Sequence, residues 1–162
     1  MTTAASVGSE PQVDAPPLLC PTTGGEMHQQ PRVVQVGSWL TPQDLADVAI
    51  GHALVGVADG VRDRLATARA VVDQALAAGT PTYGLNRGLG PLRDSTIPDG
   101  LMADFQRFVI LSHSAAIGPP LARIESRATL LARLNTLAAG ASGASPALFE
   151  GLLALLQRDV IP

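Results

Sequence analysis

The chain has 162 residues, of which 46% are apolar and only 3% aromatic, and its formal net charge is -3. This length corresponds to about one domain, whose core must be mainly aliphatic. The sequence contains no basic block that would attract nucleic acid or an anionic membrane, and no apolar run approaches the roughly 20 residues of a membrane-spanning helix.

Residues 1–31 are rich in Pro, Gly, Ser and Thr and carry few large apolar side chains. Such a segment buries too little surface to offset the entropy of ordering it, so a disordered tail is predicted there. It lacks the basic start and continuous apolar core of a secretory signal, and the single cysteine, Cys20, cannot form an internal disulfide. We therefore expect a cytoplasmic protein with one ordered domain over residues 32–162.

The ordered part is predicted to contain about five helices and almost no sheet. A short strand is expected over residues 32–36, and a helix should begin where Thr41 can act as the N-cap and Pro42 can take the first helical position. Apolar residues then recur at helical spacing from Val61 until Gly79 ends that helix. A long loop rich in Gly and Pro follows over residues 79–98, and long loops inside compact domains are often functional.

Three further helices are predicted after this loop. Asp99 can cap the first of these helices. Pro119-Pro120 end the first helix and start the second, and Gly140 and Gly143 break the second. Ser145-Pro146 open the third helix. Residues expected to face inward on the second helix are Leu121, Ile124, Leu131, Leu134 and Leu137, and on the third Phe149, Leu152, Leu153, Leu156 and Val160. The third helix runs almost to the end of the chain, which fits either a missing neighbour or docking on its own domain.

The only tyrosine, Tyr83, stands at the head of a loop that contains Gly84, Gly88 and Gly90. The glycines allow tight turns and close approach to a ligand. A phenol has a pKa near 10 in water, so a base role requires nearby donors or cations, of which Arg87 is one candidate. From these residues alone, a buried tyrosine that anchors the loop is the favoured interpretation. The loop lacks the third glycine and the Lys-Ser/Thr pair of nucleotide-binding loops.

Ser112 and His113 lie on a predicted helix with an apolar face. A histidine in this setting is most often a hydrogen-bonded core residue, but an imidazole beside a hydroxyl can also recognise a polar ring of a substrate. The three histidines, His28, His52 and His113, do not have the spacing of metal ligands, so no metal site is expected.

Taken together, several motifs resemble the N-terminal part of the aromatic amino acid ammonia-lyases, the methylidene-imidazolone enzymes, and are most like the histidine ammonia-lyases. They are Tyr83-Gly84-Leu85-Asn86-Arg87-Gly88-Leu89-Gly90, Gln106, Ser112-His113, and the segment from Arg127 to Gly143. The resemblance spans residues 33–162. It implies an all-α fold, namely the helical N-terminal domain of the ammonia-lyase fold, truncated before the cofactor-forming segment and the central bundle of long helices.

The resemblance also implies roles for single residues. Tyr83 corresponds to the catalytic tyrosine that takes the β-proton, and Ser112 and His113 correspond to the pair that sets substrate selectivity. Arg87 and Leu89 stand where threonine and phenylalanine are usual in the family, so the shape and charge of a substrate pocket are expected to differ there.

The family's electrophilic cofactor, methylidene-imidazolone, forms when an internal Ala-Ser-Gly tripeptide cyclises and loses water. The triplet Ala141-Ser142-Gly143 matches the family's helix end and not the cofactor segment, which lies further on, so a helix cap is favoured here. No cofactor is therefore expected within this chain.

The leading hypothesis is the N-terminal subunit of a split ammonia-lyase or aminomutase, a hetero-oligomer acting on an aromatic or histidine-like amino acid, with the cofactor supplied by a C-terminal partner polypeptide. Two alternatives are a lyase-like scaffold without the cofactor that does acid–base chemistry on another substrate, and a non-catalytic partner of a lyase homologue. The sequence of the partner would separate the three.

Overall fold

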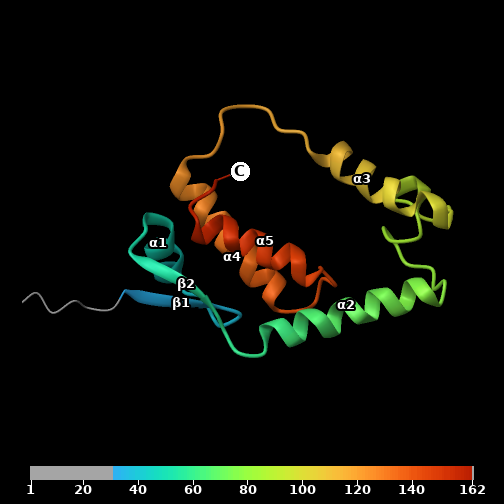
Figure 1. Cartoon of the computed structure of the whole chain (residues 1–162). Helices are drawn as coiled ribbons and strands as arrows, with labels where there is room; N and C mark the ends of the chain where they lie inside the picture. Colours follow the sequence, from blue (N-terminus) through green and yellow to red (C-terminus); the bar gives the residue numbers. More distant parts are fainter. Residues whose placement is uncertain (1–30, 162) are drawn as a thin grey trace, which may run out of the picture. The chain divides into compact units, whose positions relative to one another are not determined.

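The computed structural model describes residues 31–161. The tail predicted over residues 1–31 therefore lies, apart from Pro31, outside the described residues, and so does His28. Within the described range the chain forms five α-helices, one small sheet and two short 3-10 helices (Figure 1). The predicted helical character is confirmed, with the sheet as an addition.

A two-stranded parallel sheet opens the described part of the chain. Strand β1 (Arg32–Val36) pairs with β2 (Ala53–Val57) in a register that places Val34 beside Val55, and helix α1 (Pro42–Ile50) connects the strands. The prediction of β1 is confirmed, whereas the expectation of almost no sheet missed β2. A short apolar run of this length cannot be assigned to strand or helix by periodicity alone, and β2 is a strand because β1 pairs with it.

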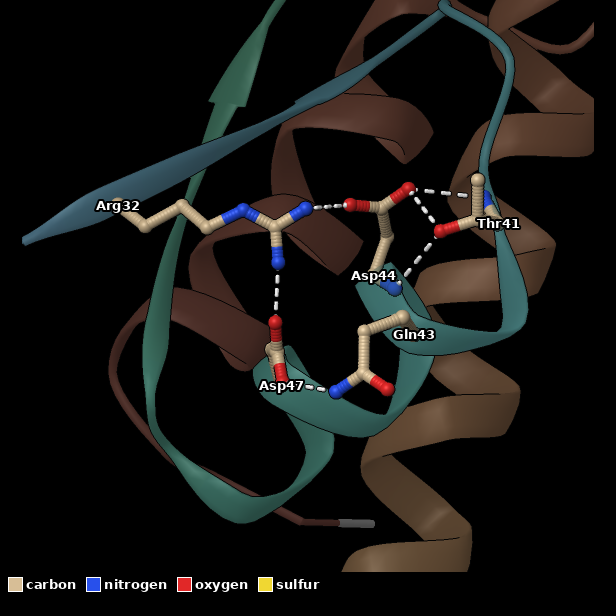
Figure 2. A network of polar contacts seen from close by, with 5 residues as sticks. All are labelled: Arg32, Thr41, Gln43, Asp44 and Asp47. Atoms are coloured by element: carbon tan, nitrogen blue, oxygen red, sulfur yellow. Dashed lines mark hydrogen bonds and ion pairs between the residues drawn. The ribbon is translucent and has the colours of Figure 1, made fainter.

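The start of α1 is held by a network of polar contacts (Figure 2). The hydroxyl of Thr41 accepts a hydrogen bond from the backbone N–H of Asp44 at 3.1 Å, and the Asp44 carboxylate accepts one from the backbone N–H of Thr41 at 2.8 Å. This reciprocal pair is a capping box, and it confirms the predicted N-cap. The guanidinium of Arg32 binds both Asp44 and Asp47, so β1 is tied to the first turns of α1.

The hydrophobic core lies where α1, the sheet and three later helices meet. Helix α4 (Arg123–Ala138) packs against α1, α5 (Pro146–Gln157), α2 (Val61–Ala77) and β1, and Figure 1 shows α4 and α5 side by side. The largest side chains buried there are Phe149, Leu65, Leu131, Leu134, Leu137, Leu156, Val36, Val48 and Val61. The predicted leucine stripe of α4 from residue 131 to 137 is confirmed.

Arg127 is a charged side chain inside this core, only 7% exposed. Its guanidinium donates to the backbone carbonyls of Val48 and Ala49 at the end of α1, to the carbonyl of Leu156 near the end of α5, and to the carboxylate of Asp159. The last carbonyls of a helix lack partners within the helix, and a cation is favoured there. Arg127 therefore joins the C-terminal ends of two helices.

Helix α3 (Met102–His113) follows two 3-10 turns, η1 (Gly90–Leu92) and η2 (Asp99–Leu101), and packs against η2. None of its residues is buried, and Phe108 is 65% exposed.

Three residues predicted to face inward are exposed, namely Leu121, Ile124 and Val160. Leu121 precedes α4, Ile124 lies in its first turn, and Val160 follows the end of α5, so these positions lie beyond the packed part of each helix.

Candidate active site

The loop that carries Tyr83 is organised by the buried side chain of Asn86. The amide oxygen of Asn86 accepts from the backbone N–H of Thr82 at 2.7 Å, and its amide nitrogen donates to the carbonyl of Thr80 at 2.9 Å. The backbone carbonyl of Thr82 in turn accepts from the N–H groups of residues 85, 86 and 87. Asn86 thus replaces the hydrogen bonds that a regular element would supply, and it fixes the turn on which Tyr83 stands.

Two of the loop glycines are needed for conformational reasons. Gly84 has a φ of 69°, in the left-handed region that favours glycine. Gly88 lies against the backbone of Leu92, where a β-carbon would come within 2.3 Å of the carbonyl oxygen. The backbone of this loop therefore turns and packs more tightly than other residues would allow.

Tyr83 lies on the surface of this loop and is 63% exposed, so it is not the buried anchor that the residues alone favoured. Its phenolic oxygen accepts a hydrogen bond from the backbone N–H of Gly90 at 3.2 Å. The ring lines a hollow of about 430 Å³ together with Pro81, Arg87, Arg93 and Asp94. The phenolic oxygen is thus bonded to the loop backbone, and Tyr83 borders an open hollow of the surface.

Gln106 connects α3 to this loop. Its side-chain amide donates to the carbonyl of Gly84 at 2.8 Å and lies 3.5 Å from the carbonyl of Leu85. Helix α3 is therefore attached to the backbone of the loop just after Tyr83. The sequence pattern matched this glutamine to the family but did not indicate its contact with the loop.

Ser112 and His113 form a local hydrogen-bonded pair at the C-terminal end of α3. The Nδ1 atom of His113 lies 2.8 Å from the carbonyl of Val109 and 3.1 Å from the Ser112 hydroxyl, which itself donates to the same carbonyl. A carbonyl can only accept, so Nδ1 carries the hydrogen in this contact and the neutral ring presents Nε2 as an acceptor. Both side chains are exposed, contrary to the core histidine favoured on the pattern alone.

The structure brings only some of the predicted site residues together. Arg87 lines the hollow beside Tyr83, and the side chain of Leu89 packs over Gly84, 3.2 Å from the place of a β-carbon there. His113 follows Gln106 by seven positions on α3, about 10 Å along the helix. No contact between Tyr83 and His113 is found within residues 31–161.

The triplet Ala141-Ser142-Gly143 forms the corner between α4 and α5. Gly140 and Gly143 have φ angles of 75° and 63°, and a β-carbon at Gly143 would lie 2.4 Å from the side chain of Val72. The Ser142 hydroxyl accepts a hydrogen bond from the N–H of Ala144. Ser145 then caps α5 by accepting from the N–H of Leu148. The predicted helix cap is present.

The contacts at this corner are those of a helix cap. Gly143 packs against Val72 of α2, and the Ser142 hydroxyl, which cyclisation would eliminate, bonds the turn. We therefore derive no chemical step from this triplet.

Two polar residues contribute to the fold in ways the sequence reasoning missed. The side-chain oxygen of Asn135 accepts from the backbone N–H of Gly37 at 2.7 Å, which links α4 to the end of β1. Arg127 holds two helix ends, as described above. Neither contact has a local sequence signal, because the partners lie far away along the chain.

Among residues 31–161, no cluster of three or more side chains suits a metal ion, and no helix is long and apolar enough to cross a membrane.

The sequence model of the family described as aromatic amino acid lyase matches residues 40–162. The chain belongs to this family. It is 41% identical over 126 residues to a histidine ammonia-lyase from Anaeromyxobacter dehalogenans, a match that covers 78% of this chain and 25% of the relative. The chain thus spans about a quarter of the length of the curated relatives it matches.

Solved structures from the family give the same result. An ergothionase from Treponema denticola, an ergothioneine-degrading enzyme, matches with a TM-score of 0.75 and 30% identity, covering 80% of this chain and 26% of that one. A tyrosine aminomutase from Streptomyces globisporus matches with a TM-score of 0.74 and 31% identity, covering 82% and 25%. The helical fold described here is that of the N-terminal region of ammonia-lyases and aminomutases, enzymes that use methylidene-imidazolone.

Proposed function

We propose that this chain is the N-terminal subunit of a split ammonia-lyase or aminomutase that acts on an aromatic or histidine-like amino acid. In an ammonia-lyase the β-carbon loses a proton and the neighbouring C–N bond breaks, which leaves ammonia and an α,β-unsaturated acid. In this proposal Tyr83 removes the β-proton.

The geometry of Tyr83 is the observation that carries the proposal. Its oxygen accepts from the N–H of Gly90, and no other partner of this oxygen is found in the described part of the chain. The phenol can therefore exchange a proton with a molecule in the hollow. Asn86 and Gln106 hold the backbone of the loop, which limits the motion of the phenol relative to a substrate.

His113 has a separate role in the proposal. Its Nδ1 is occupied by the Val109 carbonyl, so the ring offers Nε2 to a ligand. An acceptor of this kind suits a substrate ring that carries an N–H or O–H donor, such as imidazole or phenol. Ser112 restrains the imidazole through its hydroxyl. Together they would set the preference among ring types without taking part in proton removal.

In this proposal the rest of the active site comes from a second polypeptide. The chain corresponds to about a quarter of its relatives, and the exposed apolar residues of α3 offer a surface for the remainder. Methylidene-imidazolone supplies an electrophile that activates the amino group as a leaving group. The corner 141–143 serves as a helix cap, so the partner would provide that group.

The experiment is reconstitution with a polypeptide that co-purifies with this chain and contains a Gly-Ala-Ser-Gly-Asp segment. The complex should release ammonia from an aromatic amino acid or isomerise it, and Tyr83→Phe should lower turnover by about 10²–10⁴-fold while the complex still forms. A partner without that segment would favour the cofactor-free scaffold, and a complete lyase as partner would favour a non-catalytic role. Full turnover by Tyr83→Phe would exclude this tyrosine as the base.

A further inference from the structure

The hollow in front of Tyr83 carries positive charge from two arginines. Arg87 and Arg93 line it, and Asp94 is the acidic residue in its wall. The Asp94 carboxylate lies 3.6 Å from the guanidinium of Arg93 and so neutralises that arginine in part. Arg87 contacts the backbone carbonyl of Asp94 and not its carboxylate. Of the two arginines that line the hollow, Arg87 is therefore the one whose charge has no opposite charge beside it.

The guanidinium of Arg87 is also held in place. One terminal nitrogen, Nη1, donates to the carbonyl of Asp94 at 3.1 Å and to the hydroxyl of Thr96 at 2.5 Å. The other two nitrogens have no partner within residues 31–161, and no buried side-chain nitrogen there is unpaired, so both reach solvent. The entropy of ordering a long side chain is thus already lost before a ligand arrives, while two N–H-bearing nitrogens remain to bind one.

We propose that Arg87 forms a carboxylate-binding subsite in the hollow that Tyr83 also lines. A guanidinium with two free nitrogens matches the two oxygens of a carboxylate. The proposed function supplies the identity of the ligand, which is the carboxylate of an aromatic amino acid or of its unsaturated product. The family pattern has threonine at this position, so the subsite would be a particular property of this chain.

The single tyrosine allows the subsite to be observed in the full chain. Biosynthetic replacement of tyrosine by 3-fluorotyrosine gives one fluorine, at Tyr83, whose NMR signal reports on the hollow. The probe is trans-cinnamate, and the uncharged control is cinnamamide, which has the same ring and alkene. Cinnamate should shift the signal saturably and cinnamamide should not. Raising NaCl to about 0.5 M should weaken the response, because salt screens an exposed charge.

Variants identify the residue that is responsible. Arg87→Thr should bind cinnamate about tenfold more weakly, the loss expected for one charge-assisted contact. Arg87→Lys keeps the charge but loses the two-nitrogen match, so it should bind cinnamate more weakly than the wild type and more tightly than Arg87→Thr. Arg69→Thr is the matched control: Arg69 lies on α2, pairs with Asp73 and does not line the hollow, so binding should be unchanged.

Four results would overturn the subsite: no saturable shift with cinnamate, an equal shift with cinnamamide, wild-type binding by Arg87→Thr, or equal losses in Arg87→Thr and Arg87→Lys. The measurement needs only this chain. It can therefore fail while the lyase activity of a reconstituted complex stands, and it can succeed where reconstitution fails.

Discussion

The buried guanidinium of Arg127 allows a sharp test of how this domain is held together. We predict that Arg127→Met destabilises the fold by about 3 kcal/mol. Methionine replaces much of the apolar stem, so the loss comes chiefly from hydrogen bonds. The carbonyl of Ala49 loses the one donor found for it within residues 31–161, at about 1–3 kcal/mol, and the carbonyls of Val48 and Leu156 each lose a charged donor.

The assay is urea unfolding followed by circular dichroism. With a slope of about 1.5 kcal/mol per molar urea, a loss of 3 kcal/mol lowers the midpoint by about 2 M. Arg127→Lys should fall in between, because a single ammonium cannot reach both helix ends. Arg62→Met is the matched control, since Arg62 pairs with Glu150 on the surface, and its midpoint should change little. Equal midpoints for Arg127→Met and Arg62→Met would refute the role assigned to Arg127.

Three further outcomes are expected. In the reconstituted complex, His113→Leu should shift preference from polar to apolar substrate rings with little effect on proton removal, which competition between two substrates measures. The peptide 141–143 should keep its full mass in mass spectrometry, because loss of two waters would mean that it had cyclised, and Ser142→Ala should cost about 1 kcal/mol or less. Hydrogen bonds from Thr41 hold the pKa of Asp44 below the ordinary value of an aspartate. Its contribution to stability is therefore present above that ordinary pKa and lost as pH falls through the lowered pKa, so the difference in urea midpoint between wild type and Asp44→Asn should close as the pH is lowered.

The parts of the fold that were predictable from the sequence are those with a local cause. The caps at Thr41 and Ser145 follow from side chains that bond their own first turn, and the leucine stripe of α4 follows from helical periodicity. Strand β2 and the contacts of Arg127 have no local cause, because each depends on a partner far away along the chain. An arginine on an amphipathic helix is indistinguishable, in sequence, from any surface arginine.

In the candidate site, too, the features with a local cause were predictable and the others were not. The turn under Tyr83 is formed by neighbours in sequence, with Asn86 bonding Thr82 and Thr80, so the glycine-rich pattern was a good guide to it. Exposure was not predictable. Both the tyrosine and His113 were expected to be buried on pattern alone, and both lie on the surface, because burial depends on what packs over a loop and not on the loop itself.

The loop around Tyr83 has a fixed backbone but an exposed tyrosine, and a complete active site would need both a positioned base and exclusion of water. The backbone around Tyr83 is fixed by contacts inside the chain, through Asn86 and through Gln106 on α3, so the phenol is oriented without help from another polypeptide. Exclusion of water is what the chain does not provide, since Tyr83 is 63% exposed. Electrostatic effects on a proton transfer strengthen when water is removed. In the proposed split enzyme, the partner would therefore contribute desolvation and the electrophile, while this chain contributes a base that is already in position.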